Sequence, residues 1–98
     1  MSSFDVSVLP DAEAEAREAF LWYFERSPVA ADTFRSELFR AIDSLGTTAN
    51  DWPEDEDGIR HYHLRHFPYT LMYALANGDV TVLAVAHQRR RPEYWQGR

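Results

Sequence analysis

The chain has 98 residues, of which 45% are hydrophobic and 14% are aromatic, and its formal net charge is −6. This length predicts one domain, residues 1–98, with a single hydrophobic core, and the acidic balance argues against a protein that binds nucleic acid with its whole surface. The absence of cysteine excludes a disulfide scaffold, a cysteine-ligated zinc site and a cysteine nucleophile, and no apolar run or leader pattern predicts a membrane span or a signal peptide.

The first part of the chain predicts a strand followed by two helices. Residues 4–9 alternate apolar with polar side chains, which is typical of a half-buried strand. Pro10 ends this strand and opens a helix that runs to about Glu25, because proline is tolerated in a first helical turn. A second helix follows at once, since Ser27 is a good N-cap and Pro28 a good first helical residue.

The second helix has the clearest periodic pattern in the sequence. Its apolar residues recur at helical spacing and predict one buried stripe: Phe34, Leu38, Ala41, Ile42 and Leu45. We expect Gly46 to close this helix in a left-handed conformation. The link between the two helices is short, which predicts an antiparallel helix hairpin.

The remaining sequence predicts an acidic loop over residues 47–58, then strands, then a basic tail. Branched, aromatic and other apolar residues indicate three strands, over residues 59–64, 69–76 and 79–86. Asn77-Gly78 joins the last two strands and is typical of a type I′ hairpin turn. Residues 87–98 form a tail that is rich in arginine and aromatic side chains.

This order of elements predicts an α+β fold, with the antiparallel helix hairpin packed on one face of a mostly antiparallel sheet. No helix is left to cover the opposite face of the sheet. We therefore expect polar and charged residues to collect on that face. The candidates are His61 and His63, or Arg60 and Tyr62, together with Thr70 or Thr81.

Charge is divided unevenly along the chain. Residues 1–57 carry 14 acidic residues and 4 arginines, whereas residues 58–98 carry 2 acidic residues, 6 arginines and all 4 histidines. Lysine is absent, so every basic side chain apart from histidine is an arginine, which suits bidentate contacts with carboxylate or phosphate. This polarity indicates two surfaces with different partners.

Several motifs together resemble the RelE/ParE toxins of bacterial type II toxin–antitoxin systems. The opening strand and helix pair has Pro28 and Ala31 at the start of its second helix. Residues 64–69 read LRHFPY, with Tyr73 four residues further on and the Asn-Gly hairpin after it. Residues 86–95, AHQRRRPEYW, resemble the closing motif of many small members of this family, and the resemblance covers nearly the whole chain.

The resemblance implies a cytoplasmic growth inhibitor that a cognate antitoxin silences in a toxin–antitoxin hetero-oligomer. RelE-like members cut mRNA on the ribosome, whereas ParE-like members act on DNA gyrase without cutting RNA. The arginine of the nuclease pattern falls on Thr70, its following basic residue on Arg89, and its C-terminal tyrosine on Trp95, with Tyr94 one place away. Two of these positions depart from the nuclease pattern, which favours the ParE-like interpretation over an endoribonuclease; an inactive family member is the third alternative.

Candidate site residues follow from the resemblance and from side-chain chemistry. If the protein is a nuclease, its catalytic residues are Arg65, His87, Arg89 and Tyr94. The target-binding candidates are Arg60, Arg89, Arg90, Arg91 and Trp95. The antitoxin-binding candidates are Phe20, Trp22 and Phe24, of which we expect at least one to be exposed in the free protein. His61 and His63 share one strand face, but two imidazoles do not make a zinc site, so we expect no metal and no cofactor.

Overall fold

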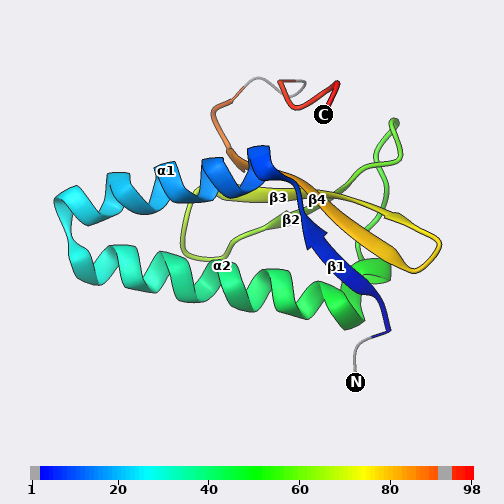
Figure 1. Cartoon of the computed structure of the whole chain (residues 1–98), viewed down its shortest axis with the longest axis horizontal. Coiled ribbons are helices and arrows are strands. Elements are labelled where there is room, and N and C mark those ends of the chain that lie inside the picture. The colour runs from blue at the N-terminus through cyan, green and yellow to red at the C-terminus, as the bar shows by residue number, and fades with distance from the viewer. Residues whose placement is uncertain (1–2, 91–93) are drawn as a thin grey trace.

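The computed structural model describes residues 3–90 and 94–98, and it has one layer of two helices against one sheet (Figure 1). The elements in chain order are β1 (Asp5–Val8), α1 (Pro10–Arg26), α2 (Pro28–Thr48), the 3₁₀ turn η1 (Ala49–Asp51), β2 (Arg60–His63), β3 (Tyr69–Ala76) and β4 (Asp79–His87). This order confirms the predicted α+β fold. Neither helix of the described residues is long and apolar enough to cross a membrane.

The sheet has the strand order β1-β4-β3-β2, so that β4 lies inside it. β3 pairs in antiparallel fashion with both β2 and β4, whereas β1 pairs with β4 in parallel. The sheet is therefore mostly antiparallel, as predicted. Asn77 and Gly78 both have positive φ angles, 54° and 82°, which fits the predicted type I′ turn between β3 and β4.

A single residue, Ser27, joins the two helices. Its backbone N–H donates to the carbonyl of Tyr23 at 2.7 Å, which ends α1. Its side-chain Oγ accepts a hydrogen bond from the backbone N–H of Ala30 at 3.1 Å, which caps α2. The predicted N-cap is thus confirmed, and the one-residue link forces the helices to lie antiparallel on the same face of the sheet (Figure 1).

The prediction that Gly46 closes α2 is wrong. Gly46 is buried within the helix, which continues to Thr48. Its carbonyl accepts hydrogen bonds from the backbone N–H groups of Ser3 and Phe4, at 2.7 and 2.9 Å. The end of α2 therefore anchors the chain as it enters β1. Because this contact joins distant parts of the chain, the residues next to Gly46 in the sequence do not predict it.

The main core lies between the helix hairpin and the sheet. The largest side chains that are fully enclosed there are Tyr73, Phe34, Leu45, Leu71, Val80 and Val82. Phe34 of α2 is the centre of an aromatic cluster, with ring centroids 5.3 to 5.4 Å from those of Tyr23, Phe67 and Tyr69. The predicted periodic stripe of α2 thus faces the sheet, although Ile42 stays partly exposed.

The opposite face of the sheet is not the bare polar surface that we expected. His61 and His63 lie on it, and the imidazole Nδ1 of His63 is 2.6 Å from the Thr70 hydroxyl. The centre of this face of the sheet, however, is apolar and covered. Trp95 packs there as part of a second cluster of buried residues with Ile59, Met72, Ala84 and Ala86. The prediction considered only helices as covers, whereas the C-terminal segment performs this role.

The buried hydroxyl of Tyr73 gives a test of the main core. It donates to the carbonyl of Ala49 at 2.6 Å, and burial raises the pKa of Tyr73 to about 12. We expect Tyr73→Phe to lower the free energy of unfolding by about 1–2 kcal/mol, because the Ala49 carbonyl loses its donor in a dry site. Urea denaturation measures this change. Tyr62→Phe on the neighbouring strand is the matched control, and an equal loss in both variants would contradict the assignment.

Candidate functional site

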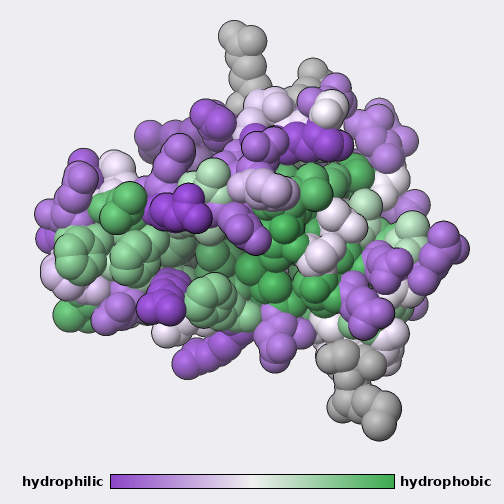
Figure 2. Space-filling model, in the orientation of Figure 1, coloured by the Kyte–Doolittle hydropathy of each residue, from purple (hydrophilic) through white to green (hydrophobic). Residues whose placement is uncertain are grey.

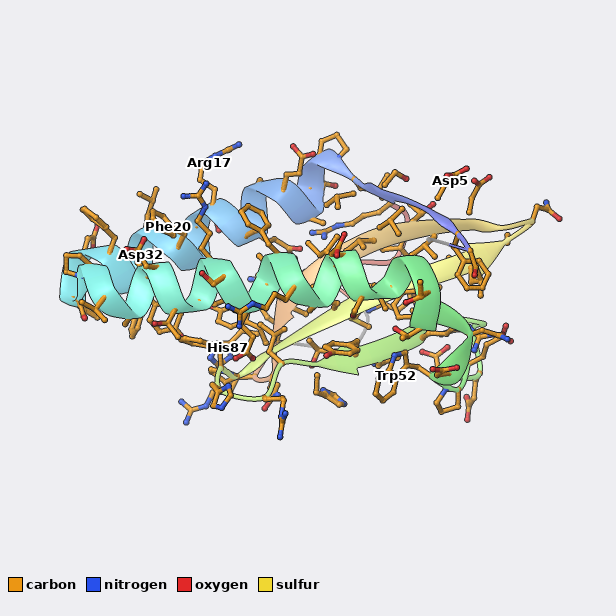
Figure 3. All side chains as sticks on the ribbon, turned by 90° about the horizontal axis from the view of Figure 1, so that it is seen from below. Asp5, Arg17, Phe20, Asp32, Trp52 and His87 are labelled. Atoms are coloured by element: carbon orange, nitrogen blue, oxygen red, sulfur yellow. The ribbon has the colours of Figure 1, made fainter. Side chains whose placement is uncertain are left out.

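The predicted catalytic residues lie around one end of the sheet, where β2 and β4 end and β3 begins. His87 is the last residue of β4, and its ring meets that of Tyr69 edge-to-face at 5.1 Å. The backbone N–H of Arg89 donates to His87 Nδ1 at 3.0 Å, so the other ring nitrogen is the one that carries the proton in the neutral imidazole. Figure 3 shows His87 well separated from Trp52, which lies toward the other end of the sheet.

Arg65 lies in the bend after β2, which α2 holds in place. The Glu37 carboxylate accepts backbone N–H groups from Arg65 and His66, at 2.7 and 3.1 Å, and it also contacts the His66 ring at 2.6 Å. Burial alone would raise the pKa of Glu37, but these hydrogen bonds outweigh it and lower the pKa. An ionised carboxylate thus positions the bend, and the Arg65 side chain remains exposed.

Tyr94 is turned into the molecule. Its hydroxyl is buried beside the Glu15 carboxylate of α1, and the guanidinium groups of Arg90 and Arg98 lie over its ring, 4.4 and 5.1 Å from the centroid. Burial and, after it, the Glu15 carboxylate raise the pKa of Tyr94 well above its usual range. The Tyr94 hydroxyl is therefore shielded from solvent.

The side chains of these four candidates are not joined to one another among the described residues. Within residues 3–90 and 94–98, no hydrogen bond or ion pair joins the side chain of one to the side chain of another. Thr70, where the resemblance places the nuclease arginine, is 6% exposed, and its hydroxyl contacts the imidazole of His63. His61 in turn contacts Asp55 at 2.8 Å, and the described residues bring together no group of three metal-ligating side chains.

The target-binding candidates differ in accessibility. Arg89 and Arg90 are exposed just after β4, whereas Arg91 lies outside the described residues. Arg60 is occupied by the preceding loop, because its guanidinium donates to the carbonyl of Trp52 and to Glu54. Trp95 is only 7% exposed and cannot touch a target without moving. Of the target-binding candidates that the structure describes, Arg89 and Arg90 are therefore the accessible ones, and they lie at the end of the sheet.

An apolar groove opens between the two helices. It has a volume of about 370 Å³ and runs over β1, where Figure 2 shows hydrophobic residues gathered between α1 and α2. Small residues of α1, Ala12 and Ala16, line it and keep it open. The larger apolar residues around it are Val8, Phe20, Phe34, Phe39, Ile42 and Val85, and the charged residues are Glu13, Arg17 and Arg35.

The three antitoxin-binding candidates lie on α1, but only Phe20 lines this groove. Trp22 and Phe24 are 52% and 50% exposed, which confirms that at least one of the three is exposed in the free protein. The guanidinium of Arg26 lies 3.7 Å from the Trp22 ring centroid. Sequence reasoning missed Phe39, which is 56% exposed at the rim of the groove. Its position beside the periodic stripe of α2, rather than on it, is the signal that could have found it.

Sequence reasoning also missed the pair formed by Glu15 and Arg98. The guanidinium nitrogens of Arg98 bind both carboxylate oxygens of Glu15, at 2.9 and 3.2 Å. The two side chains are 14% and 16% exposed, so the ion pair is largely shielded from solvent. These residues lie at opposite ends of the chain, and no spacing rule connects them.

Comparisons with known proteins agree with this architecture. A solved structure described as "Chromosomal ParDE TA system from P. aeruginosa" superposes with a TM-score of 0.77 over 87% of this chain and 96% of that chain. The sequences are 16% identical, so this match establishes a shared fold. No curated protein sequence matches significantly.

The fold is thus that of a small α+β protein shared with a chain of a toxin–antitoxin system. A family profile described as "ParE toxin of type II toxin-antitoxin system, parDE" matches residues 6–92, which is most of the sequence. The chain therefore belongs to the ParE toxin family, and the resemblance predicted from its motifs is confirmed.

The Asp55 site beside β2 predicts a pH dependence of stability. Burial alone would raise the pKa of Asp55, but hydrogen bonds from His61 and from the backbone N–H groups of Ile59 and Asp57 lower it. A carboxylate with a lowered native pKa stabilises the fold above its unfolded pKa of about 3.9, and this contribution is lost as the pH falls through the native value. We expect parent and Asp55→Asn to differ most near neutral pH and to converge in acid.

Urea denaturation at several pH values measures this difference. We expect it to be about 1 kcal/mol or less, because both partners are about one-third exposed and solvent screens them. Asp57→Asn is the control, because its exposed carboxylate lies in the same loop. A difference between parent and Asp55→Asn that is the same at neutral and acidic pH would rule out this role for the carboxylate.

Proposed function

We propose that this ParE-family protein is a growth-inhibiting toxin that acts in the cytoplasm by binding its target, DNA gyrase, rather than by cutting RNA. The observation that supports the proposal is that the side chains at and beside the nuclease positions are buried. Thr70 stands where the resemblance places an arginine, and its hydroxyl contacts His63. Trp95 stands where the resemblance places a tyrosine and is buried, and the hydroxyl of the adjacent Tyr94 is buried beside Glu15. The end of the sheet therefore offers exposed cationic side chains, those of Arg89 and Arg90, for binding a partner.

The proposed target surface contains Arg89 and Arg90, which follow β4 and are exposed. Guanidinium groups on an otherwise acidic protein favour an acidic protein surface as the partner, because the remaining net charge repels a polyanion. Arg65, on the neighbouring bend, lies at the same end of the sheet.

The second candidate function is ribosome-dependent mRNA cleavage. One observation favours it: a pocket of about 190 Å³ is lined by His61, His87 and Arg90, which combines imidazole with guanidinium. Such groups support proton transfer and phosphate binding in RNA cleavage. A third outcome, an inactive family member, corresponds to a protein whose induction leaves growth unchanged.

A direct test adds the purified protein to gyrase and, separately, to a translation reaction. We expect dose-dependent loss of DNA supercoiling and intact mRNA. Because Arg89 and Arg90 supply the proposed contacts, Arg89→Ala/Arg90→Ala should raise the concentration needed for inhibition about tenfold or more. Arg40→Ala, an exposed arginine of α2, is the control. Cleaved mRNA with unaffected supercoiling would establish the second candidate instead.

We further propose that the antitoxin neutralises this protein by laying an amphipathic helix into the groove between α1 and α2. Helices bind such grooves through an apolar stripe, and the depth provided by Ala12 and Ala16 suits bulky side chains. The groove carries acidic and basic residues at its rim, which set the orientation of the bound segment.

Phe39 tests this docking site. It is 56% exposed, so Phe39→Ala should leave the stability of the free protein almost unchanged. We expect the variant to bind the antitoxin encoded by the neighbouring gene about tenfold more weakly, because an aromatic anchor at the groove is lost. Isothermal titration calorimetry measures the affinity. Val29→Ala is the control, because Val29 lies on the same helix but is 76% exposed and outside the groove, and it should bind like the parent. Unchanged affinity of Phe39→Ala would show that the antitoxin binds elsewhere.

A further inference from the structure

The edge of β4 that faces β1 is completed by two side chains. β1 pairs with β4 only along Asp79–Val82, because the chain then turns into α1. Beyond this point, the Glu15 carboxylate accepts the backbone N–H of Val85 at 3.0 Å, and the Arg98 guanidinium donates to the carbonyl of Leu83 at 3.2 Å. Glu15 and Arg98 also bind each other, so together they take the place of the missing strand.

Arg98 is also the polar attachment of the C-terminal segment, residues 94–98. Besides Glu15 and Leu83, its Nε lies 3.5 Å from the Asp11 carboxylate, and its guanidinium covers the ring of Tyr94. The backbone N–H of Arg98 turns back to the carbonyl of Trp95 at 3.3 Å. One terminal side chain therefore holds the segment against α1 and β4.

Trp95 is the apolar attachment of the same segment. Its ring packs on Ile59, Met72, Ala84 and Ala86, yet its indole N–H is buried without a hydrogen-bond partner. A buried donor that lacks an acceptor disfavours the closed arrangement, since water would bind the N–H if the segment moved away. Burial of the apolar surface of Trp95 thus favours the closed arrangement, whereas the unpaired indole N–H disfavours it.

The pairing between β3 and β4 beneath this segment does not depend on it. Met72 and Ala84 are register partners in the antiparallel β3–β4 ladder, as are Thr70 and Ala86. Lifting residues 94–98 would therefore break no hydrogen bond between strands, and only the Leu83 carbonyl would lose a side-chain donor. The segment can leave the sheet by local opening, with the rest of the fold intact.

We propose that residues 94–98 form a releasable cover over the apolar far face of the sheet, with the Arg98–Glu15 ion pair as its latch and Trp95 as its plug. Opening the latch exposes Trp95 and the strip made of Met72, Ala84 and Ala86. This inference goes beyond the proposed function, and it adds one consequence that rests on it: Trp95 and Tyr94 reach a target only in the open form.

The cover is tested by fluorescence in a protein whose only tryptophan is Trp95, made by Trp22→Phe and Trp52→Phe. In this background we expect blue-shifted emission and weak quenching by acrylamide. Arg98→Ala should shift the emission to the red and raise the quenching constant severalfold. Arg98→Lys should fall between them, because lysine keeps the charge but loses the bidentate contact. Glu18→Gln, an exposed carboxylate on α1, is the control and should match the background protein.

Circular dichroism and urea denaturation show whether each variant stays folded. Equal quenching in folded Arg98→Ala and its parent would overturn the latch. If Arg98→Ala does not fold, hydrogen exchange on the parent protein decides the matter. Amides of residues 94–98 should exchange well before those of β4, and exchange of both only by global unfolding would overturn a releasable cover. Neither measurement needs gyrase, so a protein that fails to inhibit gyrase can still pass both.

Discussion

The structure depends on shielding both faces of β4 from solvent. Its residues Val80, Val82 and Val85 pack toward the helices, while Ala84 and Ala86 pack toward the far face, and all are buried. A strand buried on both sides needs two covers. The helix hairpin is one cover, and the C-terminal segment with Trp95 is the other. Among the described residues, two surfaces remain open to partners, the groove between α1 and α2 and the end of the sheet after β4.

Electrostatics ties the two covers together. The acidic first half of the chain and the basic second half meet where Glu15 of α1 holds Arg98, with Arg90 4.0 Å from the same carboxylate. This contact is shielded, so its geometry and hydrogen bonds count for more than its bare charge. It also completes the edge of β4 beyond β1. One carboxylate therefore links an α-helix, a strand edge and the C-terminus.

The open surfaces differ in chemistry, which fits the idea of two partners. The groove between α1 and α2 is apolar and set in the acidic half of the sequence. The end of the sheet carries Arg65, Arg89 and Arg90, all exposed. An amphipathic helix suits the first surface and an acidic protein surface the second. These two surfaces lie on different elements, so a partner bound in the groove does not have to contact the arginines at the end of the sheet.

Local sequence determined the elements, their order and the family. The roles of Ser27-Pro28 and Asn77-Gly78 could be predicted because a helix cap and a tight turn depend on adjacent residues. The expectation that at least one aromatic residue among Phe20, Trp22 and Phe24 is exposed was also correct. Tertiary structure alone decided the roles of Gly46, Trp95 and the Glu15–Arg98 pair. Each of these roles depends on a contact between segments far apart in the chain, where periodicity and spacing carry no information.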